Sequence, residues 1–560
     1  MLQQALLLLI VSSIVSSSNE LSQVVVLDAG SSGTRIHIYN FNWEDHVPRI
    51  DKTQIEEQTK KIRPGLSTLS DSNDMEIEKS VVNSFTSLFN FAKTCVSIAA
   101  RSKTPVILKA TAGMRLVPPR KASKIMNAAR NFLVDSEFLF LEADWASIIA
   151  GSEEAGLAWI ASNYLSGAFD NAVSSNTVGV VEMGGASSQI SFAVQNQFSF
   201  HNLNSDRRFK FTDFYGHAHY VYATSYLGFG RDQAYARLDS VLVKNVGGSG
   251  GQSGQSGQSG QSGQSRIIAQ PCHRTGYTKT YTDTTTATSV VVQGSGDYIQ
   301  CLVLIERWLF NASVTDQPPI IPGTELDQGA LAPTNSASSA SRRNNSDPVP
   351  LVATEVFYYV RDEFRASSQM NSQLHNRFME LSPESTLLFG RAVCTSSINE
   401  KEGREDSCFT VGFQAMFLKY IGVTRAPKIV RDIGGVQMEW AIGAAIQHLV
   451  MYGQPPSSNG APRAGVWSFG ETIVFALGVT FAVLGSLVVV VKWILATECL
   501  SDLCQWVYRM TGGSGGRAGG GGIRARRKRR GSPKVRNYDR VQTQDDDENG
   551  VAIEIGQLER

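Results

Sequence analysis

The sequence lacks an excess of charge of either sign. Its 52 lysines and arginines almost balance its 51 aspartates and glutamates, so the formal net charge is only +1. Proteins that bind nucleic acids usually carry clustered positive charge, so this composition gives no hint of a nucleic-acid partner. The 560 residues are otherwise ordinary for a globular protein, at 42% hydrophobic and 18% charged, and they are enough for two or three domains.

The N-terminus lacks the basic residues that usually open a secretory signal peptide. It does contain an apolar run at residues 5–15 (ALLLLIVSSIV), followed by small and polar residues at 16–19. This run is shorter than the ~20 residues that a membrane-spanning helix needs. We therefore predict a cleaved signal peptide over residues 1–18, with an uncleaved anchor as the alternative. In either case the chain enters the secretory pathway.

Cysteine is scarce, with seven in the whole chain, and a zinc site would need tighter spacing of cysteines and histidines. Cys95 falls in a stretch with helical apolar spacing (residues 75–100) and has no histidine near it in sequence. We expect it to be a small core residue and not a nucleophile. Cys272 and Cys301, like Cys394 and Cys408, are close enough in sequence to pair, although spacing alone leaves the connectivity open.

The most informative stretch is residues 24–39, VVVLDAGSSGTRIHIY. Four apolar residues lead into Asp28, a glycine- and serine-rich turn follows, and residues 35–39 alternate as a half-buried strand does. Glycines let backbone N–H groups surround an anion, hydroxyls add donors, and the carboxylate suits a hydrated divalent cation. The pattern predicts a strand–turn–strand phosphate site whose ligands are Gly30, Ser31, Ser32, Gly33 and Thr34.

Residues 177–192, TVGVVEMGGASSQISF, repeat this arrangement. An apolar strand again ends in a carboxylate, Glu182, and an alternating strand leaves the glycine turn. One such hairpin alone is an ordinary turn of small residues, but a duplicated binding geometry is hard to explain as two accidents. We therefore expect two related lobes that each offer one phosphate loop to a shared cleft. The second loop consists of Gly184, Gly185, Ala186 and Ser187.

The two hairpins resemble the first and fourth signature regions of the apyrases, the nucleoside triphosphate diphosphohydrolases. Three more segments follow the family order: KATAGMRL at 109–116, AGSEEAGLAWIASNY at 150–164 and YLGFGRD at 226–232. The resemblance, over residues 22–450, implies an α/β fold of two ribonuclease-H-like lobes, as in the actin-like superfamily. The first lobe would hold residues 22–151 and 432–451. The second would hold residues 152–431, with disordered insertions at 247–265 and 329–345.

The third signature falls in a stretch with a helical apolar pattern, residues 143–165. Its two adjacent glutamates would point about 100° apart on a helix, so both cannot face one substrate. Counted from Gly151, the family pattern selects Glu154, and its implied role is general base for the water that attacks the terminal phosphorus. By the same resemblance, Ser187 and Gln189 orient this water.

The resemblance also implies a divalent cation, Ca²⁺ or Mg²⁺, held through water by Asp28 and Glu182. The chain departs from the family here, because Glu182 stands where aspartate is usual. Two further departures are Ala155 and Leu157, in place of a glycine and an aromatic residue. The remaining implied assignments are Thr111 at the phosphate, Arg115 bracing its loop, Tyr358 stacking on the nucleobase, and the disulfides Cys272–Cys301 and Cys394–Cys408.

Together these assignments imply a metal-dependent enzyme that hydrolyses nucleoside tri- and diphosphates to monophosphate and phosphate by direct attack of water. Cys95 and the histidines lie outside the signatures, so nothing suggests a covalent intermediate. Two alternatives stay open. One is a catalytically inactive nucleotide-binding membrane receptor, which the departures at residues 155, 157 and 182 allow. The other is a kinase or ATPase of the same superfamily.

Residues 473–491 are uncharged, mostly apolar and long enough for a transmembrane helix. The basic cluster RARRKRR at 524–530 follows, so the positive-inside rule places the tail (residues 492–560) in the cytosol and the catalytic part in the lumen or outside the cell. The sequons at Asn311 and Asn344 would then be glycosylated. The short span, and the resemblance of SSGTR to Golgi-type apyrases, favour the Golgi over the cell surface.

Overall fold

The computed structural model describes residues 22–453 with gaps at 45, 54, 56, 171–176, 195–196, 248–265, 283–288, 312–349, 369–375, 380, 397–404 and 424–425. The predicted signal peptide, the two insertions (apart from Gly247), Asn344, the predicted transmembrane span and the tail lie outside the described residues. Within the described residues, no helix has both the length and the apolar character needed to cross a bilayer.

Secondary structure elements alternate along the chain. Up to the third signature they are β1 (Ser22–Ala29), β2 (Thr34–Glu44), β3 (Val47–Ile50), β4 (Thr59–Ile62), η1 (Leu66–Asp71), α2 (Asp74–Cys95), α3 (Ile98–Arg101), β5 (Val106–Ala110), α4 (Ala112–Arg115), α5 (Pro119–Val134), η2 (Ala143–Trp145), β6 (Ala146–Ile148) and α6 (Gly151–Leu165). The later elements are β7 (Gly179–Met183), β8 (Ser187–Ala193), α7 (Gln197–Asn202), η3 (Ser205–Arg207), β9 (Arg208–Thr212), β10 (Ala218–Leu227), α8 (Arg231–Gly247), β11 (Arg266–Gln270), β12 (Thr278–Thr282), β13 (Ser289–Gly294), α9 (Tyr298–Ile305), η4 (Glu306–Phe310), β14 (Leu351–Glu355), α10 (Val356–Ser368), α12 (Pro383–Thr395), α13 (Ser407–Tyr420), β15 (Lys428–Ile429), β16 (Asp432–Ile433), β17 (Val436–Gln437) and α14 (Trp440–Tyr452).

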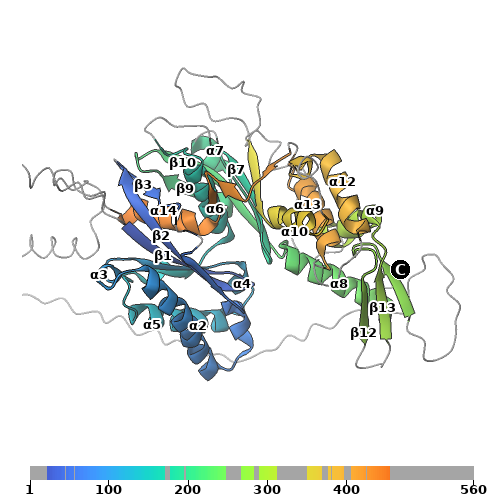
Figure 1. The fold of residues 1–560 in the computed structure, drawn as a ribbon, viewed down its shortest axis with the longest axis horizontal. Coiled ribbons are helices and arrows are strands. Elements are labelled where there is room, and N and C mark those ends of the chain that lie inside the picture. The colour runs from blue at the N-terminus through green and yellow to red at the C-terminus, as the bar shows by residue number, and fades with distance from the viewer. Residues whose placement is uncertain are drawn as a thin grey trace, which may run out of the picture. The chain divides into compact units, whose positions relative to one another are not determined.

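The first sheet contains the first predicted hairpin. Strands β1 and β2 pair antiparallel around the glycine turn, and the strand order is β3-β2-β1-β5-β6, with β4 also paired to β2. Strand β5 runs parallel to β1 and leads the second signature to the same edge of the sheet. Helices α2 and α5 cover one face through apolar side chains (Figure 1). The helical spacing of residues 75–100 therefore predicted a real helix, which ends at Cys95 and is followed by the short α3.

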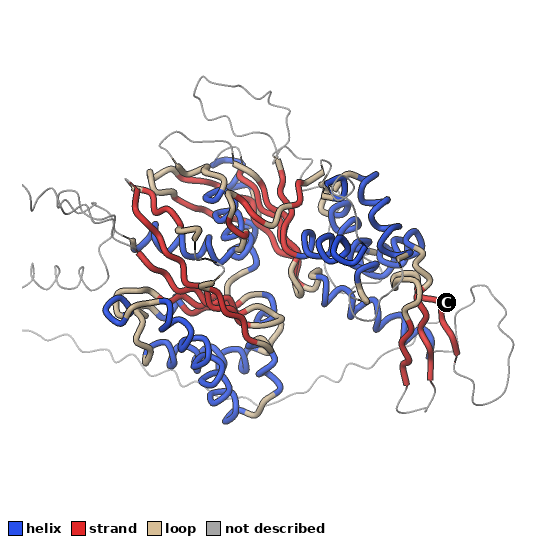
Figure 2. Tube along the Cα trace, viewed as in Figure 1, coloured by secondary structure: helices blue, strands red, loops and turns tan. Residues whose placement is uncertain are grey.

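The second sheet contains the second hairpin. Strands β7 and β8 pair antiparallel around their turn, and the strand order is β15-β14-β7-β8-β10-β9. Strand β14 comes from a much later part of the chain and lies parallel to β7. One face of this sheet packs against α8, α10 and α13, and Figure 2 shows both sheets with their helices. The chain is thus a mixed α/β protein.

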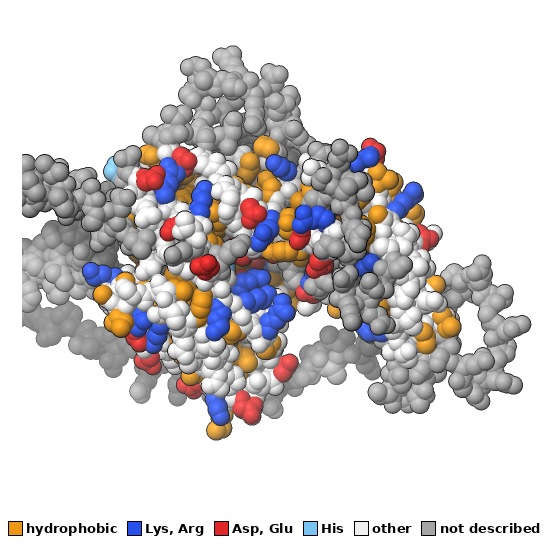
Figure 3. Space-filling model, viewed as in Figure 1, with side chains coloured by type: hydrophobic (Ala, Val, Ile, Leu, Met, Phe, Trp, Pro, Cys, Tyr) orange, Lys and Arg blue, Asp and Glu red, His pale blue; other side chains and the backbone are white. Residues whose placement is uncertain are grey.

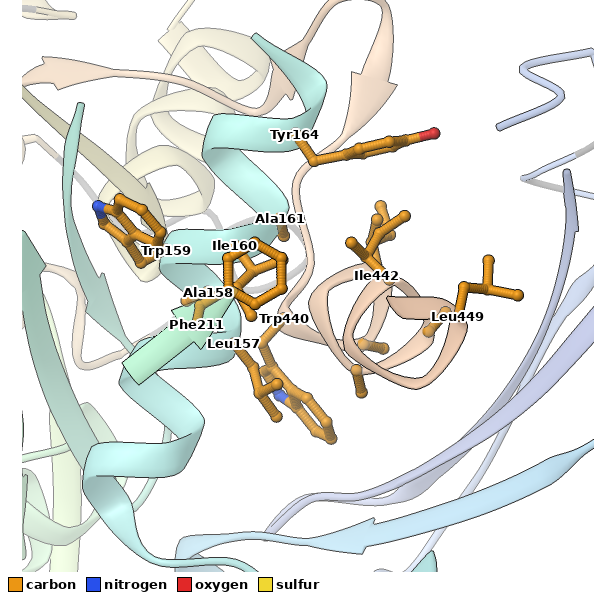
Figure 4. Packing of buried hydrophobic residues seen from close by; sticks show 14 of the residues in the cluster. Leu157, Ala158, Trp159, Ile160, Ala161, Tyr164, Phe211, Trp440, Ile442 and Leu449 are labelled. Atoms are coloured by element: carbon orange, nitrogen blue, oxygen red, sulfur yellow. The ribbon is translucent and has the colours of Figure 1, made fainter. Parts of the chain in front are cut away.

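Helices α6 and α14 are packed against both sheets. Their apolar side chains form one cluster with residues such as Val24 of the first sheet and Val221 of the second. Figure 4 shows side chains of the two helices facing each other, among them Leu157 and Trp440. A helix that is apolar on all sides, as α6 is, needs such burial all around it. At Gly443 the helices touch directly, because an added Cβ would lie 1.9 Å from the carbonyl oxygen of Leu157.

The structure contains both expected disulfides. The S–S distances are 2.07 Å in Cys272–Cys301 and 2.06 Å in Cys394–Cys408. The first joins the segment after β11 to α9, and the second joins α12 to α13. Cys95 is a free, partly buried thiol that packs against the core beneath α2, as expected for a core residue.

One predicted helix is wrong in its first part. Residues 143–165 were expected to be helical throughout, but α6 begins only at Gly151. Before it, residues 143–145 form a turn of 3₁₀-helix and residues 146–148 form the edge strand β6, which pairs with β5. An apolar pattern over so few residues fits an edge strand as well as a helix, and pairing with the sheet decides between them.

Candidate active site

In the first hairpin, Asp28 faces Arg35 directly across the strand pair. Arg35 Nη1 donates a hydrogen bond of 3.0 Å to Asp28 Oδ2, whereas Asp28 Oδ1 is buried without a hydrogen-bond partner. Burial raises the pKa of Asp28 and the charge of Arg35 lowers it, with a net rise. Buried polar atoms in folded proteins nearly always have partners, so this oxygen marks a place for a water, a cation or a ligand.

The turn of the first hairpin lies against the second and fourth signatures. A Cβ atom added to Gly113 would lie 2.7 Å from Ser31 Cα, and one added to Gly185 would lie 3.1 Å from Ser31 Oγ. Glycine permits this close approach because it has no side chain. Thr111 fixes the second signature from the other end, since its N–H donates to the carbonyl oxygen of Ala29 (3.2 Å). The two glycine turns therefore meet at Ser31.

The fifth signature supports the turn of the second hairpin. The backbone N–H groups of Gly228, Arg231 and Asp232 donate to carbonyl oxygens of residues 186, 184 and 185, at 2.8, 2.9 and 2.8 Å. A Cβ at Gly230 would lie 2.4 Å from the backbone nitrogen of Ala186. These contacts satisfy the carbonyl groups of the turn, and the N–H of Gly184 donates to the carbonyl oxygen of Ser187 within the turn (2.9 Å). The segment YLGFGRD thus supports the second turn through backbone hydrogen bonds.

Glu154 is the buried end of a polar network that joins three signatures. It lies in the first turn of α6 and is 6% exposed. Arg115 Nη2 donates to Glu154 Oε2 at 2.8 Å and lies 3.4 Å from Ser187 Oγ, while Arg115 Nη1 donates to the carbonyl oxygen of Ile149 at 3.1 Å. Gln189 Nε2 donates to Ser187 Oγ at 2.6 Å. The structure therefore places Glu154, Ser187 and Gln189 side by side, with Arg115 holding Glu154 and Ser187 together.

The two adjacent glutamates of α6 have different surroundings, as helix geometry predicted. Burial raises the pKa of Glu154, and the charge and hydrogen bond of Arg115 lower it, with a net rise. Glu153 is less buried and lies 3.9 Å from the ammonium of Lys109, away from the network. Burial raises the pKa of Glu153 too, so the position beside Arg115 and Ser187, and not the pKa, distinguishes Glu154 from its neighbour.

Glu182 is the penultimate residue of β7, and its charged neighbours are acidic. It is 7% exposed, and its Oε2 is buried without a hydrogen-bond partner. Burial raises its pKa well above the ordinary value, and so do the charges of Glu355, Glu154, Asp28 and Glu439. We call these five carboxylates the acidic cluster.

A divalent cation fits the acidic cluster, provided that it is held through water. Three oxygens of the two hairpins, Asp28 Oδ1, Thr34 Oγ1 and Glu182 Oε2, are buried and unpaired. Hard cations such as Ca²⁺ and Mg²⁺ prefer oxygen ligands and often keep several waters. Among the described residues, no three His, Cys, Asp or Glu side chains are arranged to ligate a metal directly. Asp28 and Glu182 would therefore act on the hydration shell of the ion.

Several residues of the site had no assignment from the sequence. Arg35 was detectable, because a residue opposite Asp28 in a hairpin must lie beside it. Lys61 of β4 reaches the first turn, where its Nζ donates to Ser32 Oγ at 3.4 Å. Figure 3 shows basic side chains gathered near the middle of one face, with acidic side chains beside them. Glu355 and Glu439 come from distant parts of the chain and carried no local signal.

Tyr358 lies on α10, outside the network around Glu154. It is partly buried against the core on that side of the second sheet, and its ring meets that of Tyr359 edge-on at 5.7 Å. The hydroxyl of Tyr359 accepts a hydrogen bond of 3.0 Å from Gln437. Stacking of Tyr358 on a nucleobase stays a prediction. Asn311, the sequon that the structure describes, is exposed, as a glycosylated residue must be.

Comparison with known proteins adds independent information. A family described as GDA1/CD39 (nucleoside phosphatase) matches residues 14–455. A guanosine-diphosphatase of Saccharomyces cerevisiae is 38% identical over 231 residues, which are 41% of this chain and 42% of that protein. A protein of Arabidopsis thaliana named probable apyrase 5 is 31% identical over 289 residues, 50% of this chain and 54% of the relative. The chain therefore spans about half the length of these curated relatives.

Solved structures show the same fold at low sequence identity. A crystal structure described as nucleoside triphosphate hydrolases from Neospora caninum aligns with a TM-score of 0.53 and 15% identity. The alignment covers 80% of this chain and 96% of that one. At this identity the similarity concerns the fold alone.

Proposed function

Because this chain belongs to the GDA1/CD39 (nucleoside phosphatase) family, we propose that it hydrolyses nucleoside tri- and diphosphates to nucleoside monophosphate and phosphate. One observation carries the proposal: two glycine turns meet at Ser31, and a buried carboxylate, Glu154, is tied to the second turn through Arg115. Cleavage of a phosphoric anhydride by water requires anion-binding groups beside a base that can reach the water.

Glu154 is the proposed general base. Its raised pKa strengthens it as a proton acceptor, and the hydrogen bond from Arg115 favours its ionised form. Ser187 Oγ accepts the hydrogen bond of Gln189 and lies near Arg115, so its hydroxyl hydrogen is available to a water. A water held by Ser187 beside Glu154 would lose its proton to Glu154 as it attacks the terminal phosphorus.

The two turns are the proposed phosphate cradle. Their backbone N–H groups, with the hydroxyls of Ser31, Ser32 and Thr34, supply donors to the phosphate oxygens. Lys61 and Arg35 add positive charge at the first turn, which favours an anion there. These donors are fixed in position before substrate binds, which is the condition for stabilising the charge of a transition state.

The proposed cofactor is Ca²⁺ or Mg²⁺, held through water by Asp28 and Glu182. The unpaired buried oxygens of these two carboxylates support this assignment. When bound, such an ion neutralises charge on the phosphate oxygens. Asp28 and Glu182 come from different hairpins, so an ion held by both carboxylates would fix the two turns relative to each other.

The finer description of the architecture and location is also a proposal. Two ribonuclease-H-like lobes, residues 22–151 with 432–451 and residues 152–431, are supported by the hairpin that each sheet contains. A lumenal or extracellular position is supported by the two disulfides, which persist in oxidising compartments. Residues 473–491 would anchor the chain in the membrane, and the Golgi is the favoured compartment.

The test is phosphate release by the purified full-length protein. ADP, GDP, UDP and their triphosphates are compared in Ca²⁺, in Mg²⁺ and in EDTA. We expect release that depends on the metal and that Glu154→Gln lowers by ~10²–10⁴-fold. Glu153→Gln is the matched control, since it removes the neighbouring carboxylate of the same helix and should leave the rate nearly unchanged.

Each alternative has its own outcome in this assay. Nucleotide binding by a folded protein without any phosphate release would favour an inactive receptor. Transfer of phosphate to an added acceptor instead of water would favour a kinase. Release that Glu154→Gln leaves intact would assign the base to another residue.

A further inference from the structure

Glu355 has a backbone conformation that an L-residue rarely adopts. Among the described residues it is the only non-glycine residue with a positive φ, at 59°. This left-handed region is disfavoured for a residue with a long side chain and is usually occupied by glycine or asparagine. Such strain persists where the surrounding structure holds it, and it concentrates at functional sites.

The position of Glu355 makes the unusual backbone relevant to the acidic cluster. It ends strand β14, which runs parallel to β7 so that Thr354 pairs with Glu182 and Glu355 with Met183. Regular strand alternation would put Glu355 on the face of Leu351 and Ala353, in the apolar core. A carboxylate there would be costly. The left-handed turn ends the strand geometry at this residue.

The charged neighbours of Glu355 come from both hairpins. The charges of Arg35 and Lys61 lower its pKa, and those of Glu439 and Asp28 raise it, while burial is the largest influence and brings the pKa to about 7. In turn, Glu355 is the strongest charged neighbour acting on Glu182. Together with the pairing of β14 and β7 and the left-handed backbone, these charge effects assign Glu355 to the acidic cluster.

The cations of the site form direct ion pairs with other carboxylates. Arg35 pairs with Asp28, and Arg115 pairs with Glu154. Among the described residues, neither Glu182 nor Glu355 has an ion-pair partner.

The last member of the cluster, Glu439, has a histidine beside it. His37 Nδ1 lies 3.2 Å from Glu439, but burial lowers the pKa of this histidine to about 4, so it is neutral near pH 7. Glu182 also retains a buried oxygen with no hydrogen bond, although it is 7% exposed. Two carboxylates without a direct ion-pair partner, on the paired strands β7 and β14, one of them with an unsatisfied oxygen, form an incomplete site.

We propose that Glu355 is a third carboxylate of the divalent cation site, positioned by its left-handed backbone to act with Asp28 and Glu182 on the hydration shell of the ion. This inference rests on the proposed function, because it concerns the same cation. It gives the strained backbone a role, since a relaxed strand would direct the carboxylate away from Glu182. It also explains how a glutamate at position 182 is tolerated, because a second carboxylate from β14 faces the ion from the neighbouring strand.

The test is direct binding of Mn²⁺ to the nucleotide-free full-length protein at pH 8, followed by electron paramagnetic resonance. Glu355→Gln keeps the size and removes the charge, and we expect it to weaken Mn²⁺ binding by roughly tenfold. Glu355→Gly removes the charge and also relieves the left-handed backbone, so it should fold well and bind Mn²⁺ as weakly as Glu355→Gln. Glu153→Gln, outside the cluster, should bind like the unmodified protein.

Each result separates this inference from the proposed function. Equal Mn²⁺ binding by the unmodified protein and by Glu355→Gly would overturn the role of Glu355 and leave phosphate hydrolysis untouched. An unmodified protein that does not bind Mn²⁺ would also overturn it. Weaker binding by both variants, in a protein that releases no phosphate from any nucleotide, would support the cation site while the hydrolase proposal fails.

Discussion

The two hairpins share one backbone plan and differ in the residue that faces their carboxylate. Asp28 faces Arg35 across the first strand pair, whereas Glu182 faces Gln189 across the second. Arg35 donates to Asp28 and compensates its charge. Gln189 is neutral and donates to Ser187, so Glu182 keeps an unpaired oxygen. The residue at this one equivalent position therefore distinguishes the two hairpins. The first hairpin compensates the charge of its carboxylate with its own arginine, and the second hairpin has no such cation.

Because of this difference, we expect the two hairpins to have different roles in the proposed reaction. The first hairpin has positive charge next to its turn, from Arg35 and Lys61, and suits the binding of phosphate. The second contributes Ser187 and Gln189 to the network of Glu154 and suits the handling of water and a cation. Substitutions in the second hairpin should therefore act mainly on the rate of hydrolysis, and those in the first mainly on nucleotide binding.

The largest effect is expected when the second hairpin is made to resemble the first. Gln189→Arg would place a cation opposite Glu182 and remove the amide bonded to Ser187. We expect phosphate release to fall by ~10²–10⁴-fold, and Ca²⁺ to lose its stabilising effect on thermal unfolding.

A control is needed because position 189 is 2% exposed and arginine is larger than glutamine. Gln189→Met removes the amide without adding charge, so it should lose activity but keep the response to Ca²⁺. A Gln189→Arg protein that Ca²⁺ still stabilises as strongly as the unmodified protein would break the proposed difference between the hairpins.

A second prediction concerns Arg115, which pairs with Glu154 and lies 3.4 Å from Ser187 Oγ of the second hairpin. Arg115→Ala leaves Glu154 buried without its cation, so the pKa of Glu154 should rise further. We expect kcat to fall by roughly 10²-fold and the acidic limb of the pH–rate profile to move to higher pH. Arg101→Ala, which breaks an exposed pair with Glu137, is the control. An unshifted profile would remove Arg115 from the proposed mechanism.

Third, the glycines of the first turn should differ in their tolerance of a side chain. A Cβ at Gly33 would lie 2.5 Å from the carbonyl oxygen of Ile62 in β4, whereas the nearest atom to a Cβ at Gly30 is 3.4 Å away. Gly33→Ala should lower the free energy of unfolding by ~1–3 kcal/mol, and Gly30→Ala by much less. Gly184, with its nearest atom at 3.4 Å, should behave like Gly30. Denaturant unfolding measures all three, and equal losses would contradict the bracing of the turn by β4.

The smallest expected effect is a pH dependence of stability without metal. The folded-state pKa values of Glu182 and Glu355 are raised, the latter to about 7. The folded protein therefore binds more protons than the unfolded chain above the ordinary glutamate pKa, and this stabilising contribution is lost as pH rises through about 7.

The measurement is Tm in EDTA between pH 6.5 and 8. We expect Tm to fall by a few degrees across this range and the fall to be smaller in Glu182→Gln or with Ca²⁺ present. The buried His37 and His448 have lowered pKa values, so their contribution to stability rises with pH. This rise occurs mainly below about pH 6.5, outside the range measured. A Tm that rises over this range in EDTA would show that the carboxylates are already compensated.

The sequence predicted the local parts of the site well. A strand, a glycine turn and a second strand are adjacent in the chain, so alternation and turn residues were enough to place Asp28 and Glu182. The distinction between Glu153 and Glu154 followed from helix geometry and the family pattern, and their surroundings differ accordingly.

The long-range parts could not be predicted, for physical reasons. Glu355 comes one residue after Thr354, the partner of Glu182, because β14 pairs with β7, and this pairing depends on the strand order of the sheet and not on any residue near in sequence. Glu439 reaches the cluster because α14 packs between the sheets. The left-handed backbone of Glu355 carries no mark in its residue type, because glycine or asparagine would be expected there.

The direct contact of α6 with α14 at Gly443 has a mechanical consequence. At Gly443 the backbone of one helix lies against that of the other, so no side chain separates the two helices at this point. Glu154 stands at the first turn of α6, and Glu439 caps the start of α14. The two carboxylates therefore lie at the starts of two helices that touch backbone to backbone, so sliding of one helix along the other would have to break that contact first.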